Sequence, residues 1–189
     1  MRSVLVVTPN LSDLDLFRED LAKLNVEEIL AVRTSSEARR ILIDRVYDLL
    51  VINAPLSDEN GVRLAVDVIG NKANQVILLV KREYADEIAS KVEDYGIFTV
   101  EKPISHAAFW LALKMTSAAF NRTRSFIDEN DRLKKSLADI RLVNRAKCLL
   151  IEKLGLTEEE AHKEMEKQAM NRRMEKVELA KKIIEKYED

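Results

Sequence analysis

The first 120 residues alternate five short apolar runs with longer stretches whose apolar residues recur at helical spacing. The runs consist mainly of Val, Ile and Leu and lie at 4–7, 29–32, 48–52, 76–80 and 97–100. Strands that are apolar on both faces need cover on both faces, which is typical of parallel sheets between helical layers. The pattern predicts a doubly wound, flavodoxin-like α/β domain with a five-stranded parallel sheet over residues 1–120.

The rest of the chain contains no strand-like run and predicts an all-α region. Residues 121–189 carry 17 Lys and Arg against 15 Asp and Glu, whereas residues 1–120 carry 14 against 18. This shift in charge predicts a domain boundary near residue 120. We expect a helical coiled-coil linker over 121–139 and a three-helix domain over 140–189.

Helix start and stop signals support this division. No Pro or Gly lies between the helix expected from about residue 105 and Gly155, so that helix is predicted to run to Gly155. Thr157 and Glu160 have the spacing of a capping box, which predicts a second helix from there to about residue 170. A third helix is expected over 175–187.

Apolar and asparagine side chains recur along the predicted linker with alternating spacings of four and three. These positions are Phe126, Asn130, Leu133, Leu137, Ile140 and Asn144. Such a heptad seam is typical of a coiled coil, and Asn at two equivalent core positions favours a defined two-stranded register. The seam predicts a homodimer. The alternative is a monomer in which this stretch packs back on the α/β domain.

Charge, cysteine content and hydropathy exclude several classes of protein. The net charge is −2, which argues against a globally basic nucleic-acid binder but leaves a local basic face open. Cys148 is the single cysteine, so no intrachain disulfide can form. No apolar run approaches the ~20 residues of a membrane span. These features predict a cytoplasmic protein without a membrane partner.

Lys102-Pro103 after the fifth run, and Gly61 eight residues after Asn53, occur within the alternating pattern of residues 1–120. In these features the chain resembles the receiver domain of response regulators. The resemblance implies phosphoryl transfer to an Asp that ends the third strand. It also implies a magnesium-binding acidic pair after the first strand, a hydroxyl after the fourth and a Lys after the fifth.

The sequence departs from that chemistry at nearly every position. Thr8 and Pro9 replace the acidic pair, Asn53 replaces the phosphoacceptor and Val80 replaces the hydroxyl residue. An amide cannot form an acyl phosphate, so only Lys102 remains, with its charge expected to meet solvent or Asn53. We expect a pseudo-receiver that serves as an interaction module, with no catalytic residues, no metal and no cofactor.

The C-terminal part carries an ordered set of short motifs. Ala146-Lys147 precedes an aliphatic run, Gly155-Leu156-Thr157 precedes three acids and an Ala, and Gln168-Ala169-Met170 precedes Arg172-Arg173. This order is similar to the ANTAR domain of AmiR- and NasR-type antitermination regulators. The resemblance implies a three-helix domain that binds hairpins in nascent leader mRNA and favours an antiterminator over a terminator. It also implies a ligand-sensing regulatory protein as a further partner.

An RNA hairpin loop offers phosphates and unpaired bases, so its binder needs cations and a small or apolar contact surface. The candidate residues are Arg141, Arg145, Ala146, Lys147, Lys167, Gln168, Ala169, Arg172 and Arg173. The alternative for the cations is a solvated face, and the alternative for the alanines is close packing of helices. For Leu150 and Met170 we expect a core position.

Two other functions remain open from the sequence. The C-terminal helices could dock a protein without binding RNA, in a signalling module that a ligand-sensing partner sequesters. A DNA-binding activator is a third reading, which the lack of a helix-turn-helix pattern with a compact basic recognition helix disfavours.

Overall fold

The computed structural model describes residues 1–72 and 75–188, and the chain divides into two compact units, Met1–Arg124 and Ser125–Asp189. The division expected from the sequence, into 1–120, 121–139 and 140–189, stays a prediction at its exact boundaries. In the described ranges, no helix combines the length and apolar character that a membrane span requires.

The described residues of the N-terminal unit form one five-stranded sheet, in which every strand pairs in parallel with its neighbours. The strands are β1 (Ser3–Val7), β2 (Glu28–Val32), β3 (Leu49–Asn53), β4 (Gln75–Lys81) and β5 (Phe98–Lys102). Their spatial order is β2-β1-β3-β4-β5. The buried Val, Ile and Leu side chains of β1, β3 and β4 point to both faces, which confirms the predicted fold.

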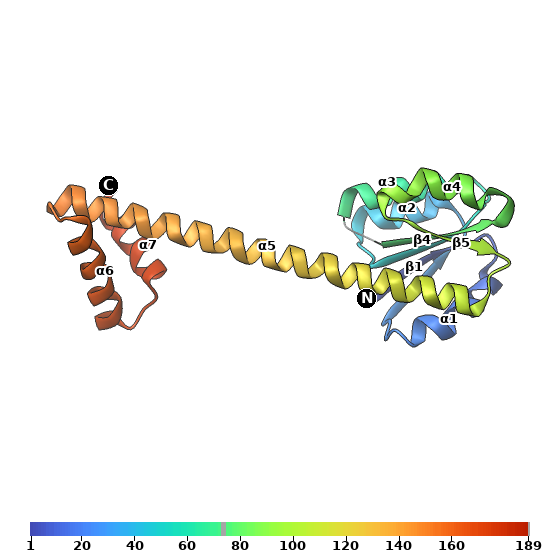
Figure 1. Cartoon of the computed structure of the whole chain (residues 1–189), viewed down its shortest axis with the longest axis horizontal. Coiled ribbons are helices and arrows are strands. Elements are labelled where there is room, and N and C mark those ends of the chain that lie inside the picture. Colours follow the sequence, from blue (N-terminus) through green and yellow to red (C-terminus); the bar gives the residue numbers. More distant parts are fainter. Residues whose placement is uncertain (73–74, 189) are drawn as a thin grey trace. The chain divides into compact units, whose positions relative to one another are not determined.

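Helices cover both faces of this sheet, as Figure 1 shows. One face packs against α2 (Ser35–Asp44), α3 (Val62–Lys72) and α4 (Ala85–Val92) in one apolar core. The other face packs against α1 (Leu14–Ala22) and the first turns of α5 (His106–Leu154) in a second core. In that second core the rings of Phe17 and Phe109 lie 4.9 Å apart.

Short-range signals fix the loops at the carboxyl ends of the strands. Thr34 caps α2 by accepting a hydrogen bond from the Glu37 N–H, as its sequence position suggests. Gly61, before α3, has a φ of 83°, and a Cβ there would lie 2.9 Å from Ile52 Cγ2. Asp58, in the loop before Gly61, accepts hydrogen bonds from both the backbone and the hydroxyls of Ser35 and Ser36. This carboxylate therefore anchors the loop after β3 to the start of α2.

The described residues of the C-terminal unit are all helical or in connecting turns. The last part of α5 is followed by α6 (Glu158–Arg172) and α7 (Lys176–Tyr187). Helix α5 ends before Gly155, whose φ is 67°, and Thr157 and Glu160 form the predicted capping box at the start of α6. These findings confirm the predicted helix ends.

Small side chains let the three C-terminal helices approach closely. Ala146 and Leu150 of α5 lie in one buried core with Ala161 and Ala169 of α6. Leu150 is buried, as expected, but the core position expected for Met170 is wrong, because this side chain is 80% exposed. The buried residues of α6 recur every four positions, and Met170 follows the last of them by one residue, or about 100° around the helix.

Candidate functional site

Three of the predicted receiver positions lie at the carboxyl edge of the sheet. Thr8 directly follows β1, Asn53 ends β3 and Lys102 ends β5. In open parallel sheets this edge is where ligands usually bind. Thr8 and Asn53 are buried, and Lys102 is partly buried.

Asn53 is held by hydrogen bonds from its own amide. Its Nδ2 donates to Asp13 Oδ2 at 2.8 Å and to Thr8 Oγ1 at 3.1 Å. The Thr8 hydroxyl donates in turn to the backbone oxygen of Asn10 at 3.0 Å. The Asn53 Oδ1 atom is buried and has no hydrogen-bond partner among the residues that the structure describes. The amide therefore acts here as a donor, with the Asp13 carboxylate as one of its two acceptors.

Asp13 is a site residue that the sequence analysis missed. It lies in a single turn of 3-10 helix (Leu11–Asp13) between β1 and α1, five residues after Thr8. The receiver pattern directs attention to the two positions immediately after the first strand, where Thr8 and Pro9 stand. A search for the first acidic residue beyond the strand would have found Asp13.

Lys102 forms a hydrogen bond to the backbone just after β3. Its Nζ donates to the backbone oxygen of Ala54, a partner that the sequence analysis did not name, and the side chain remains partly exposed. Burial lowers the pKa of Lys102 from its ordinary value, the charge of Lys81 acts in the same direction, and Asp13 opposes both. The amino group thus fixes the backbone just after Asn53.

The remaining two receiver positions offer no functional group for phosphoryl transfer. Val80 is buried in β4 and lines a hollow of about 450 Å³ beside α4, together with Ala54, Lys81 and Tyr84. Pro9 is exposed and has no backbone N–H to donate. Within the described residues, no cluster of three or more His, Cys, Asp and Glu side chains is suited to hold a metal ion. The site therefore contains a hydrogen-bonded amide in place of a nucleophilic carboxylate.

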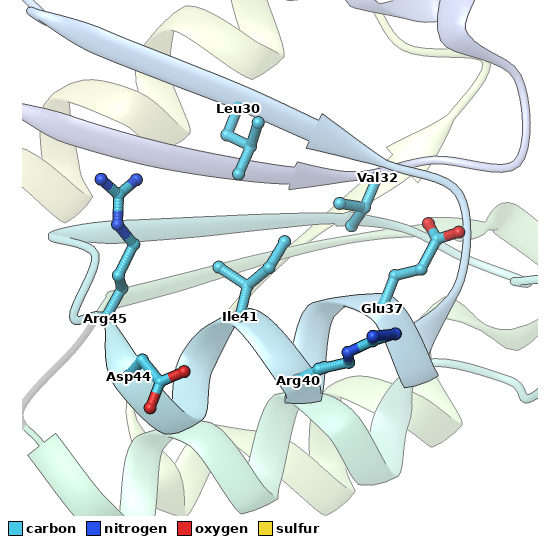
Figure 2. Close-up of a pocket in the computed structure, with 7 residues that line it drawn as sticks. All are labelled: Leu30, Val32, Glu37, Arg40, Ile41, Asp44 and Arg45. Atoms are coloured by element: carbon cyan, nitrogen blue, oxygen red, sulfur yellow. The ribbon is translucent and has the colours of Figure 1, made fainter.

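A separate hollow of about 510 Å³ lies between the edge strand β2 and helix α2. Figure 2 shows Leu30, Val32 and Ile41 facing it, with Arg45 and Glu37 at its two ends. Arg45 pairs with Glu28 at 2.8 Å, and Glu37 accepts a hydrogen bond from the Arg33 N–H. None of the residues predicted to be functional lies in this hollow.

Among the described residues of the C-terminal unit, four Lys and Arg side chains are engaged with carboxylates. The Arg145 guanidinium contacts Glu188, and Lys147 Nζ lies 3.3 Å from Glu158 Oε1. Lys163 pairs with Glu159, and Lys176 pairs with Glu166 at 2.6 Å. The hydrogen bond from Lys176 lowers the pKa of Glu166.

Of the six cations predicted to bind RNA, the four besides Arg145 and Lys147 are exposed and form no ion pair with any described residue. They are Arg141, Lys167, Arg172 and Arg173. Three of them lie in the last turns of α6 or directly after it. Unpaired cations keep their full charge available for an anionic partner, so the end of α6 is the more available basic region.

The other predicted RNA-binding residues are less accessible. Ala146 and Ala169 are buried between helices, which matches the packing alternative for both. Gln168 is partly buried, and its Nε2 donates to Glu164 Oε1 at 2.7 Å. Lys147 and Arg172 lie beside the first and last turns of α6, which are about 20 Å apart along the helix axis. The structure does not bring these two cations together.

The predicted dimer seam is an exposed stripe on α5. Its four apolar members, Phe126, Leu133, Leu137 and Ile140, are each more than half exposed, and Asn130 and Asn144 are exposed as well. Large apolar side chains at heptad spacing on one helix face are suited to cover by another helix.

Comparisons with known proteins support the resemblances expected for both halves of the chain. Residues 131–184 match the family model described as ANTAR domain. The chain is 25% identical over 175 residues to the transcriptional regulatory protein PdtaR of Mycobacterium tuberculosis, from the strains CDC 1551 and H37Rv. This match covers 90% of the chain and 85% of PdtaR.

Solved receiver domains share the fold of the N-terminal unit. A signal receiver domain from Pseudomonas fluorescens Pf-5 has a TM-score of 0.57 at 21% identity, over 66% of this chain and 92% of that one. A two-component response regulator from Clostridium difficile has a TM-score of 0.55 at 16% identity, over 64% and 99% respectively. The receiver fold expected from the sequence is thereby confirmed.

Proposed function

We propose that this chain, an ANTAR-type regulator of transcription with a receiver-fold domain, binds hairpin loops in nascent leader mRNA and so favours antitermination. The observation that carries the proposal is the basic end of α6. Lys167, Arg172 and Arg173 are exposed there without a carboxylate partner among the described residues. Such a cluster can neutralise the phosphates of a hairpin loop. The proposed role needs no catalysis and places the protein in the cytoplasm, with the transcript.

Control of this activity is proposed to be independent of phosphorylation. The Asn53 amide occupies the phosphoacceptor position and donates to the Asp13 carboxylate. A site in this state offers no nucleophile for a phosphoryl group. Regulation then comes through a protein partner, for which a ligand-sensing protein that sequesters the regulator is the expected type.

We further propose that the α5 seam holds two copies of the chain together. Burial of Leu133, Leu137 and Ile140 against their equivalents would remove exposed apolar surface from water. Asn130 and Asn144 would each face the equivalent asparagine of the second copy, and these two pairs would fix the register. A dimer carries two RNA-binding units, so two hairpins in one transcript would bind with raised effective concentration.

Selection from an RNA pool tests the function directly. The full-length protein is incubated with hairpins that share a constant stem and carry a randomised loop, and the bound RNA is sequenced. We expect particular loop sequences to be enriched and a blunt duplex of the same stem to bind weakly. Absence of any enrichment, together with equal binding of duplex and hairpins, would contradict the proposal and favour a protein-docking role.

A further inference from the structure

Met170 is a large apolar side chain that the fold leaves in water. It is 80% exposed on α6, although its neighbour Ala169 lies in the core. A single exposed methionine needs no explanation in itself. This one, however, lies within three residues of Arg172 and Arg173, both exposed and without an ion pair to a described residue. The exposed apolar side chain of Met170 therefore lies close in sequence to two unpaired cations.

Arg173 has an unusual backbone conformation for an arginine. It caps α6 with φ 51° and ψ 46°, in the left-handed region. Its N–H donates to Met170 O, and the Met174 N–H donates to Ala169 O, both at 3.1 Å. Glycine usually occupies this place, because a side chain there costs free energy. Strain of this kind is typical of functional positions, so the arginine side chain merits a role beyond ending the helix.

A surface hollow of about 690 Å³ lies beside these residues, at the turn between α6 and α7. Met170, Arg173 and Met174 line it, together with the carboxylates of Glu175 and Glu178. Glu166 and Lys176 also line it and are paired with each other at 2.6 Å. The hollow thus combines an apolar surface, one unpaired guanidinium and two carboxylates that form no ion pair with a described residue.

We propose that this hollow receives one unpaired base of the RNA loop, an inference that rests on the proposed RNA-binding function. The flat face of the base lies on the Met170 thioether, and the Arg173 guanidinium binds an adjacent phosphate. Glu175 or Glu178 accepts a hydrogen bond from the exocyclic amino group of the base. Adenine, cytosine and guanine carry such a group and uracil does not, so the hollow discriminates against uracil.

The test uses the full-length protein and the hairpin enriched from the randomised pool. Each loop base is replaced in turn by uracil, and affinity is measured for the parent protein and its variants. Met170→Ala should weaken binding of the enriched hairpin about threefold to tenfold. Replacing Glu175 and Glu178 together by Ala should remove the penalty for uracil at one loop position and leave the other positions unchanged, because these carboxylates accept the hydrogen bond from the base. Leu154→Ala, at another exposed apolar residue of this unit, is the matched control.

Arg173→Gly separates recognition from folding. Glycine adopts the left-handed region without steric cost, so the melting temperature of the variant should stay the same or rise. Affinity for the enriched hairpin should nevertheless fall about fivefold, with a salt slope smaller by about 0.7. Lys182→Ala, at an exposed lysine of α7, is the control for loss of one positive charge and should leave affinity near the parent value.

The outcomes distinguish this inference from the function on which it rests. If the parent protein binds no hairpin, both the function and the inference fail. If the parent binds but Met170→Ala and Arg173→Gly keep its affinity and its loop preferences, the function stands and the base-binding hollow is wrong.

Discussion

Nδ2 of Asn53 donates a hydrogen bond of 2.8 Å to Oδ2 of Asp13, across the carboxyl edge of the sheet. In a receiver domain that edge holds carboxylates that face a cation. Here one of the two groups is a neutral donor and the other its acceptor, so they pair directly without a cation between them, while Asn53 Oδ1 has no hydrogen-bond partner among the described residues. The two residues form a structural unit, and their chemistry predicts how the site responds to substitution.

Acetyl phosphate with magnesium should not phosphorylate the protein. The Asn53 amide cannot form an acyl phosphate, and Thr8, Pro9 and Val80 supply none of the supporting groups. Intact-protein mass spectrometry should show an unchanged mass after incubation, and an active receiver domain treated in parallel should gain one phosphoryl group. An acid-labile adduct within residues 1–120 would refute this expectation.

Asn53→Asp should destabilise the fold by at least about 2 kcal/mol at pH 7, because two carboxylates would meet in a buried site. Their proximity raises the folded-state pKa of the pair. The loss of stability is therefore absent below the ordinary carboxyl pKa near 4. It grows as the pH rises through the raised pKa of the folded state. Denaturant unfolding across this pH range measures the effect. The double variant Asn53→Asp with Asp13→Asn restores an amide–carboxylate pair and should recover most of the stability.

Asp58→Ala should lower the melting temperature, because Ser35 and Ser36 lose their shared acceptor at the start of α2. Hydrogen bonds, chiefly from the Ser35 backbone N–H, hold the pKa of Asp58 far below its ordinary value. Its contribution to stability is complete above the unfolded-state pKa of about 4 and declines as the pH falls toward the depressed folded value. The difference in melting temperature between the parent and Asp58→Ala should thus become smaller at acidic pH. Asp94→Ala, at an exposed acid, should show no such gap.

Replacing Leu133 and Leu137 by Asp should yield monomers, because a dimer would bury charges without partners. Analytical ultracentrifugation at micromolar concentration should detect the change. Lys135→Asp adds negative charge on the same helix outside the seam and should leave the dimer intact. A parent protein that sediments as a monomer would count against the seam.

Lys147→Ala and Arg172→Ala should each weaken binding to the enriched hairpin while leaving the helical content unchanged. The salt slope should fall by about 0.7 for each phosphate that the variant no longer binds. Arg172 should have the larger effect, because Lys147 is mostly covered and already paired with Glu158. Binding titrations at several salt concentrations, with Lys182→Ala as control, measure both effects. If the double variant binds as tightly as the parent, these cations do not bind RNA.

Much of the fold could be predicted because its signals are local. Buried parallel strands require apolar runs such as 4–7 and 76–80, and the capping box at Thr157 needs only a spacing of three. The end of α5 is predicted by Gly155, which is an equally local signal. These patterns are read along the chain, and no tertiary contact needs to be known.

The missed details depend on tertiary contacts. Asp13 reaches Asn53 only because the 3-10 turn after β1 brings it back over the sheet edge. Lys102 donates to the backbone oxygen of Ala54, a partner that no spacing in the sequence reveals. Hydrophobicity alone predicts a buried Met170, whereas the four-residue repeat that ends at Ala169 already points the next residue outward.

The backbone at Asn53 also bears on how long its amide survives. Deamidation of asparagine proceeds by attack of the next residue's nitrogen on the side-chain carbonyl carbon. That nitrogen, in Ala54, donates a hydrogen bond of 3.0 Å to Leu79 O in the neighbouring strand. The attack would require this bond to break inside a buried sheet. The folded sheet therefore slows spontaneous conversion of Asn53 into an aspartate.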